Sequence, residues 1–377
     1  MTGTQKSILV ALAITALVLV GSVGLLSWKV YNGWAGQPLG ASIPTSPYTP
    51  IPLPATWTPT PFTVSLLTRP TLRPSATPIP RCGGPAVMTI LAIGSDTRGT
   101  GYTWGLSDVM RVVRIDFVKP SLTVLDFPRD LWVKIPYISD NLHGQDHEKL
   151  NQAYLYGNPG DGFHYWDDPS AGPGLLARTL DLNFGVKVDH YIAVNMKTFV
   201  RMVDAVGGID VNLDKPVQNS NNRHLQKGPH HLDGDEALAL ARDRVDGVFS
   251  RGDNQNIVLC ALQKKLTSPQ VITQIPRLVQ SFKGSVQTDL SPAIMSQLAC
   301  LAAQMPRQNI TLYNFPENLF TGARQFDPVF PDQKKGVFVW DVDFNIMRTY
   351  VADFQAGSWP DAPGAASSPS RSSSFCR

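Results

Sequence analysis

The stretch of sequence best suited to chemistry is LAIGSDTRGTGYTWGLSDVM, residues 91–110, which carries Asp96 and Asp108 at the two ends of a glycine-rich loop. An apolar run typical of a β-strand precedes Asp96, and another begins at Asp108. If the two strands are neighbours, the loop brings both carboxylates to one edge of a sheet. Two carboxylates with water suit a Mg²⁺ ion that also holds phosphate oxygens. The structural alternative is an Asx turn at Asp96 and an ordinary strand start at Asp108.

Two further groups of charged residues follow. FPRDLWV supplies Arg129 and Asp130 directly after a predicted strand, and HEKLNQAYLYG supplies Lys149. The alternatives are a surface ion pair in the first segment and a solvated loop or helix start in the second.

A cluster of arginines occurs in ALALARDRVDGVFSRGDNQN, which contains Arg242, Arg244 and Arg251, with Gln255 beyond them. Guanidinium groups bind phosphate oxygens bidentately, so arginines near a turn suit a pyrophosphate. Arg242 and Arg244 are two residues apart and cannot share one face of a continuous helix. A solvated helix face is the alternative. Together with Asp96, Asp108 and Arg129, this cluster suits phosphoryl or pyrophosphate-ester chemistry.

The elements that must position these side chains alternate between strands and helices. Strands are predicted at 87–93, 109–117, 121–127, 189–195 and 209–213, and helices at 174–184, 196–208, 254–267 and 292–304. Asn195, Asp253 and Ser291 are the predicted N-caps of the last three helices. Asp233 and Glu236 form a capping-box pattern for a further helix that runs to about Asp243. The pattern predicts an α/β fold, an α/β/α sandwich with a central mixed β-sheet.

The two ends of the chain have a different composition. After a short tail, 1–6, residues 7–28 are 22 residues without a charge, enough for a membrane-spanning helix of roughly 30 Å. A cleaved signal peptide is the alternative. Residues 29–81 form a Pro/Thr-rich stalk. We therefore expect a single-pass protein of the cell membrane, with an extracytoplasmic catalytic domain at 82–354 and a disordered tail at 355–377.

Composition and cysteine usage restrict the class of protein further. The net charge of +3 is spread evenly over 377 residues, so the sequence predicts no nucleic-acid partner. Zinc is not expected because the cysteines have no CxxC spacing. Among the three possible connectivities, we expect Cys260 to pair with Cys300 and Cys82 with Cys376, with buried free thiols as the alternative.

The order of these motifs resembles the LytR-CpsA-Psr family of cell-envelope glycopolymer transferases. The matching blocks are ILAIGSDTRG, SDVM, LTVLDFPRDLWV, KLNQAYLYG, HYIAVNMKTFVRMVDAVGGIDVNL, HHLDGDEALALARDR and SRGDNQN, which span residues 87–268. The resemblance implies Mg²⁺-dependent transfer of a glycopolymer from a polyprenyl-pyrophosphate carrier to a cell-wall acceptor such as peptidoglycan. It also implies an apolar lipid pocket between sheet and helices, whose residues the motifs do not identify.

Specific roles follow from the matching positions. Asp96 and Asp108 would bind Mg²⁺ or act at the reacting centre. Catalysis would involve Asp108, Arg129 and Asp130. The residues expected to form the pyrophosphate site are Arg98, Arg129, Lys149, Arg242, Arg244 and Arg251, with Gln255 supporting the arginines. The sequence departs from the family at Asn254, which occupies the place of a common arginine, and in the segment VFSR, which ends at Arg251. A polyprenyl-pyrophosphate hydrolase and a non-catalytic envelope regulator or lipid-binding protein remain the alternatives.

Overall fold

The computed structural model describes residues 35–44 and 79–359, apart from 98, 100, 141, 143, 161–164, 219–223, 244–247, 273–281, 283–284 and 328–334. The predicted membrane span at 7–28, most of the predicted stalk and residues 360–377 lie outside the described residues. Within the described residues, no helix is long and apolar enough to cross a membrane.

A six-stranded mixed sheet forms the centre of the molecule, as predicted. Its strands, in spatial order, are β11 (Gln287–Thr288), β6 (His190–Asn195), β1 (Val87–Ser95), β2 (Ser107–Asp116), β3 (Ser121–Asp126) and β12 (Ile310–Asn314). The strands β1, β2 and β3 form an antiparallel meander, whereas β6 is parallel to β1 and β12 is parallel to β3. The β1–β2 connection begins at Asp96, and Asp108 lies on β2 just beyond its end, so the two predicted metal ligands flank this loop.

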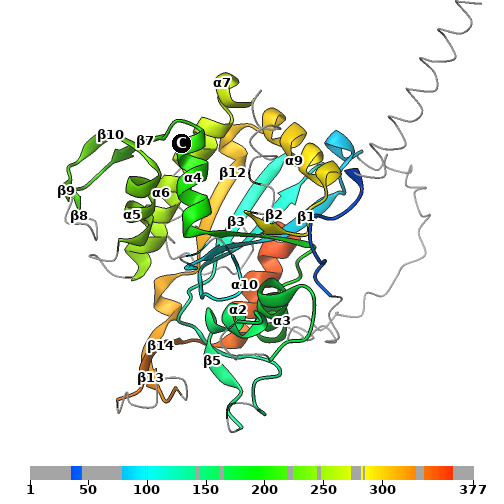
Figure 1. The fold of residues 1–377 in the computed structure, drawn as a ribbon, viewed down its shortest axis with the longest axis vertical. Helices are drawn as coiled ribbons and strands as arrows, with labels where there is room; N and C mark the ends of the chain where they lie inside the picture. The colour runs from blue at the N-terminus through cyan, green and yellow to red at the C-terminus, as the bar shows by residue number, and fades with distance from the viewer. Residues whose placement is uncertain are drawn as a thin grey trace, which may run out of the picture.

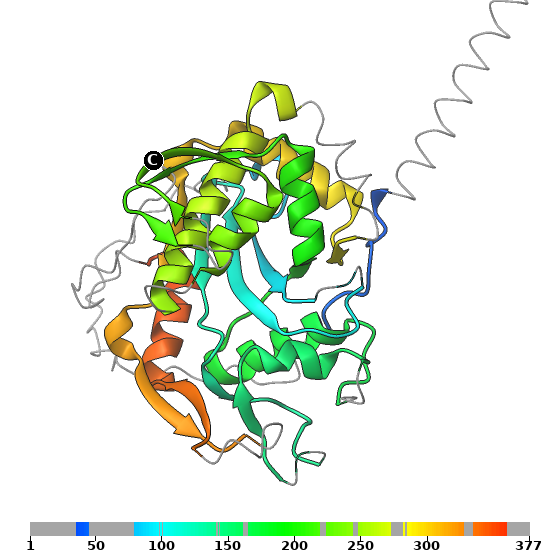
Figure 2. The same cartoon turned by 60° about the vertical axis from the view of Figure 1, so that its left-hand side comes forward.

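Helices cover both faces of the sheet, as Figures 1 and 2 show. One layer contains α2 (Gln152–Gly157), α3 (Ala171–Phe184) and α10 (Phe344–Ala356). The other contains α4 (Met196–Ala205), α5 (Gly234–Arg242), α6 (Val248–Leu266), α7 (Pro269–Ile272) and α9 (Pro292–Gln304). Buried residues of β1 such as Leu91 and Ile93 pack into the first layer, and Met88 and Ile90 face the second. The α/β/α prediction is therefore confirmed.

Short strand pairs and 3₁₀ turns complete the fold. The antiparallel pairs are β4 (Trp132–Lys134) with β5 (His147–Lys149), β7 (Ile209–Leu213) with β10 (Gly228–Leu232), β8 (Val217–Gln218) with β9 (His224–Leu225), and β13 (Thr321–Gln325) with β14 (Val337–Asp341). The 3₁₀ turns are η1 (Arg81–Gly83), η2 (Arg307–Asn309) and η3 (Glu317–Leu319). The last pair of strands lies beside the turn that holds Arg129, because Trp340 N donates to Asp130 O at 2.8 Å.

Local sequence signals explain where several helices begin. The Asn195 side chain accepts a hydrogen bond from Thr198 N at the start of α4, and Ser291 does the same for Ile294 N at the start of α9. Asp233 and Glu236 form the complete capping box at the start of α5. All three N-termini agree with the sequence predictions, since capping depends only on residues within one turn of the helix.

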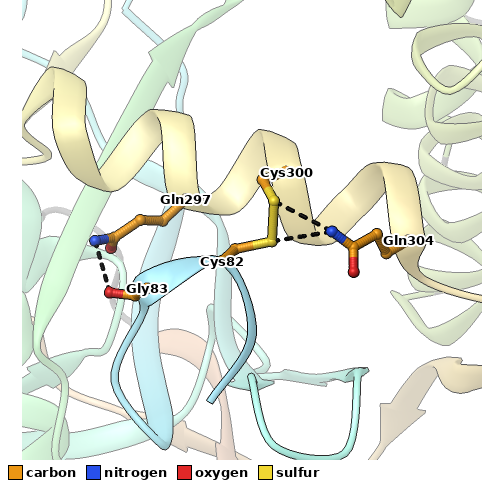
Figure 3. Close-up of a disulfide and its surroundings, with 5 residues drawn as sticks. All are labelled: Cys82, Gly83, Gln297, Cys300 and Gln304. Atoms are coloured by element: carbon orange, nitrogen blue, oxygen red, sulfur yellow. Dashed lines mark hydrogen bonds between the residues drawn. A yellow bond between two sulfur atoms is a disulfide. The ribbon is translucent and has the colours of Figure 1, made fainter. Parts of the chain in front are cut away.

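The cysteine pairing differs from both sequence-based expectations. Cys82 of η1 is bonded to Cys300 of α9, and Cys260 is also disulfide-bonded, so neither expected pair forms and no described cysteine is a free thiol. Figure 3 shows that Gln304 Nε2 contacts both sulfur atoms of the Cys82–Cys300 bridge, while Gln297 Nε2 donates to Gly83 O. Pairing depends on which segments meet in three dimensions, and sequence position did not indicate that η1 lies against α9.

Candidate functional site

A β-bulge positions Asp108. Gly94 pairs with Val109 and Ser95 pairs with Ser107, so Asp108 is an extra residue on β2 with no partner on β1. A bulge of this kind bends the strand and redirects a side chain. Asp108 consequently lines a cavity on the α4–α6 side of the sheet, together with Val109 and Arg111.

Two arginines that are far apart in the sequence both bind the Asp108 carboxylate. Arg129 Nη1 donates to Oδ1 at 2.5 Å, and Arg251 Nη2 donates to Oδ2 at 3.0 Å. The Arg251 and Asp108 side chains are only 8% and 11% exposed. Burial raises the pKa of Asp108, but the nearby charges of Arg251 and Arg129 outweigh it and hold that pKa below its ordinary value. Asp108 is therefore ionised at neutral pH.

A second carboxylate continues this chain of charges. Arg129 Nε donates to Asp130 Oδ2 at 3.2 Å, and Lys149 Nζ donates to Asp130 Oδ1 at 2.9 Å. Burial lowers the pKa of Arg129, whereas the charges of Asp108 and Asp130 raise it, with a net increase. Positive and negative charges thus alternate along Asp108, Arg129, Asp130 and Lys149. Arg129 contacts both carboxylates.

Backbone hydrogen bonds explain why these residues converge. Arg129 and Asp130 lie in the turn between β3 and β4, and Lys149 ends β5, which pairs with β4. Asn151 then joins the segments, because its N–H donates to Arg129 O at 3.1 Å and its carbonyl accepts from Ser107 N at 3.3 Å. The predicted catalytic residues therefore lie on a rigid frame and not on a free loop.

Helix α6 begins six residues earlier than the sequence predicts. We expected Asp253 to cap a helix at 254–267, but α6 starts at Val248 and contains Arg251, Asp253 and Asn254. The segment SRGDN has the composition of a turn and cap, and tertiary packing overrides that weak preference. As a result, Arg251, Gln255, Val258 and Leu262 follow helical spacing on one face of α6.

This face of α6 lines a cavity of about 250 Å³ between the helices and the sheet. Its apolar lining comes from β1, β6, α4 and α5 and from Val258, Leu259 and Leu262 of α6. Its polar lining comes from Ser95, Asp108, Arg111, Asn195, Arg242, Arg251 and Gln255. The cavity is therefore polar beside the first half of α6 and apolar beside the second half. The helical rise from Arg251 to Leu262 is about 16 Å.

Arg111 is a member of this site that the sequence analysis missed. It is 3% exposed, lies 3.1 Å from Asp126, and donates to the side-chain oxygens of Gln255 and Asn256. Burial lowers the pKa of Arg111, against the opposing effect of the Asp126 charge. An arginine within the apolar strand sequence VMRVVRIDF was the available signal. Gln255, predicted to support the arginines, contacts this one.

Asp96 lies at the same end of the β1–β2 hairpin as Asp108. It follows Ser95, the partner of Ser107, and its Oδ1 accepts from Leu106 N at 2.6 Å. No group of three or more metal-binding side chains occurs in the part of the chain that the structure describes. Asp96 and Asp108 are the described carboxylates at this end of the hairpin, and carboxylate oxygens are the ligand type that Mg²⁺ prefers when it also holds phosphate oxygens.

The remaining predicted residues have mixed placements. Arg242 is exposed at the end of α5 and lines the cavity. Asn254, at the position where the family often has arginine, is 5% exposed. Arg98 and Arg244 lie outside the described residues. The described site therefore contains Arg129, Arg242 and Arg251 from the predicted arginine group.

Relatives with curated descriptions match more than half of the chain. One is "Regulatory protein MsrR" of Staphylococcus aureus, 29% identical over 207 residues, which cover 54% of this chain and 56% of the relative. Another is "Polyisoprenyl-teichoic acid--peptidoglycan teichoic acid transferase TagU" of Oceanobacillus iheyensis, 31% identical over 229 residues, which cover 59% of this chain and 65% of the relative. The match thus spans less than two thirds of either curated relative.

Solved structures share the fold. "Crystal structure of B. subtilis TagV" superposes with a TM-score of 0.56 at 22% identity, covering 72% of this chain and 97% of that one. The model of the LytR_cpsA_psr family matches residues 84–345, which include every described site residue. This match extends over more than half of the sequence, so the chain belongs to the LytR-CpsA-Psr family.

Proposed function

We propose that this protein transfers a glycopolymer from a polyprenyl-pyrophosphate carrier to a cell-wall acceptor such as peptidoglycan. One observation carries the proposal: an apolar cavity whose polar end holds a buried carboxylate between two arginines. An amphiphile with an apolar chain and a pyrophosphate group matches this distribution of polarity. The name of the Oceanobacillus relative, a teichoic acid transferase, supports the same class of reaction.

The arginines would bind the pyrophosphate. Arg251 Nε is buried and has no hydrogen-bond partner among the described residues, so this N–H group is available to a ligand oxygen. Arg129 and Arg251 now donate to Asp108, and phosphate oxygens would compete for the same N–H groups. Arg242, at the exposed edge of the cavity, would add charge there. Bound in this way, the guanidinium groups would stabilise negative charge that develops on the leaving phosphate.

Asp96 and Asp108 would hold a Mg²⁺ ion against the pyrophosphate. When bound, this ion would neutralise charge on the phosphate oxygens. The acceptor hydroxyl would attack the phosphorus that carries the glycopolymer, and its proton would pass to Asp108 or Asp130. Polyprenyl phosphate would leave. Residues 7–28 would anchor the protein, with the catalytic domain outside the cell membrane, and the Cys82–Cys300 disulfide supports an oxidising location.

Direct binding of the carrier tests this proposal. The purified full-length chain should bind a polyprenyl-pyrophosphate-linked saccharide, and mass spectrometry of the bound lipid should identify it. A polyprenyl monophosphate without saccharide should bind more weakly because it lacks one phosphate for the arginines. Failure of any polyprenyl-phosphate lipid to bind would contradict the proposal. Binding without turnover in the presence of acceptor would indicate a regulatory role instead, which is the role that the name of the Staphylococcus aureus relative gives.

A further inference from the structure

A second cavity has a volume of about 220 Å³. Arg129 lines this second cavity, whereas its partner Asp108 lines the larger one. The Arg129–Asp108 ion pair therefore lies at the boundary between them. A transfer reaction with two substrates needs two binding regions that meet at the reacting atoms, and this pair of cavities has that arrangement.

The charges in the second cavity are balanced. Its lining includes Arg129 and Lys149, but both cations are already paired with Asp130, at 3.2 and 2.9 Å. Asp327 contributes a further carboxyl group. An anionic ligand would have to displace Asp130 from its partners and approach two acidic side chains, which costs electrostatic energy. A neutral ligand with several hydroxyl groups would meet both donors and acceptors.

Polar groups that suit hydroxyls line this cavity. Asn151 is 3% exposed, and its side-chain oxygen has no hydrogen-bond partner among the described residues. A buried acceptor without a partner costs about 1–3 kcal/mol, so a ligand hydroxyl that donates to it gains affinity. Gln152, next in the chain, also lines the cavity and is 4% exposed.

The apolar lining consists of Leu106 and two residues of β14. Val337 and Phe338 face this cavity, and Phe338 is 38% exposed, with its ring 4.9 Å from that of Trp340 in an edge-on arrangement. The Trp340 N–H donates to Asp130 O, which fixes β14 against the turn of Arg129. A pyranose ring presents C–H groups on its faces and hydroxyls at its edge, so it matches a site whose lining combines an aromatic side chain with polar groups.

We propose that the second cavity binds a neutral pyranose unit of the acceptor saccharide, with one of its hydroxyl groups beside Asp130. This inference rests on the proposed function. The hydroxyl oxygen would form a bond to the phosphorus that carries the glycopolymer, and the bond from that phosphorus to the bridging oxygen would break. The leaving polyprenyl phosphate keeps the electron pair, and the hydroxyl proton passes to the Asp130 carboxylate.

Binding of a soluble glycan fragment tests the inference without the donor. The probe is a neutral N-acetylated disaccharide prepared from peptidoglycan glycan strands with the peptides removed and the lactyl group amidated. Its dissociation constant would be measured by ligand-observed NMR with the full-length chain. Phe338→Ala should weaken binding at least fivefold. Phe326→Ala is the matched control, because Phe326 lies just beyond β13 in the same hairpin region, is 62% exposed and does not line the cavity.

A second variant addresses the polar side. Asn151→Leu keeps the side chain's approximate size and both backbone hydrogen bonds but removes the unpaired oxygen, so it should also weaken binding at least fivefold. Equal binding by wild type and both cavity variants, or no binding by wild type, would overturn the inference. If the fragment binds as expected but no glycopolymer is transferred, the proposed function fails while the saccharide site stands.

Discussion

Asp108 Oδ2 lies 3.0 Å from Arg251 Nη2, and this ion pair joins the bulge of β2 to the first half of α6. The contact spans 143 positions in the sequence. It places a carboxylate and a guanidinium group at the polar end of a cavity that is otherwise largely apolar. The arrangement connects the fold to the proposed chemistry, because binding of an anionic donor would redistribute the hydrogen bonds of this pair.

Filling the larger cavity should prevent binding of the lipid carrier. Ala241 of α5 lines it, and Ala241→Phe would place a ring in that space. We expect at least tenfold weaker binding of the polyprenyl-pyrophosphate donor, with a loss of about 1–3 kcal/mol in stability from overpacking. Ala303→Phe on the exposed side of α9 is the control and should bind normally. Unchanged donor affinity in Ala241→Phe would show that the lipid binds elsewhere.

The proposed metal site predicts a specific effect of Asp96→Asn. The amide keeps an oxygen that accepts from Leu106 N but removes the negative charge, so the hairpin should stay folded. The Mg²⁺ concentration for half-maximal transfer should rise by about 10-fold or more, as is usual when a metal site is weakened. Chelation with EDTA should stop transfer by the wild type, and added Mg²⁺ should restore it. Asp140→Asn, an exposed change, should alter neither result.

Some parts of the site depend on local sequence and others on long-range contacts, and only the local parts could be predicted from the sequence. The strands around Asp96 and Asp108 follow from runs of apolar residues, and the caps at Asn195 and Asp233 follow from residues within one helical turn. The bulge at Asp108 was not predictable, because it depends on the register with β1.

Long-range contacts account for the other differences. Arg111 joins the site only because Asp126, Gln255 and Asn256 surround it in the folded chain. The second cavity needs β14, which lies far beyond the recognised motifs in the sequence. Periodicity and spacing describe single elements, and these features arise between elements.

Glu148 predicts an unusual dependence of stability on pH. Burial and the adjacent Asp327 raise the pKa of Glu148 from 4.5 to about 9. Between pH 4.5 and 9 the folded state therefore binds more protons than the unfolded state. The contribution of Glu148 to stability is greatest below pH 4.5 and falls as the pH rises towards 9. The slope is at most about 1.4 kcal/mol per pH unit.

Glu148→Gln isolates this effect because glutamine stays neutral. Urea unfolding at pH 5, 7 and 9 should show a smaller decrease in the free energy of unfolding for the variant than for the wild type. The control is Asp146→Asn. It changes a neighbouring carboxyl group that is more exposed and whose pKa is lowered by Lys134. Parallel pH profiles for wild type and Glu148→Gln would contradict the assignment.

Loss of the Cys82–Cys300 disulfide should reduce stability without removing activity. The bond closes a segment with a sequence separation of 218, and removal of a native disulfide typically costs about 2–5 kcal/mol. The Cys82→Ser and Cys300→Ser double variant should unfold at lower urea concentration but still transfer glycopolymer at low temperature, because neither residue lines either cavity. Peptide mapping without reduction should recover Cys82 linked to Cys300, and recovery of both as free thiols would refute the pairing.

The most direct test of the central claim is to identify and quantify all products of the reaction. The purified full-length chain would be given a labelled polyprenyl-pyrophosphate-linked glycopolymer, with and without peptidoglycan. We predict covalent glycopolymer–peptidoglycan and an equal amount of polyprenyl phosphate only when the acceptor is present. Asp108→Asn and Arg251→Ala should each lower this rate by about 10²-fold or more, as expected for charged groups at a reacting centre, while Asp146→Asn should not. Release of free glycopolymer at the same rate without acceptor would contradict the account and identify a hydrolase.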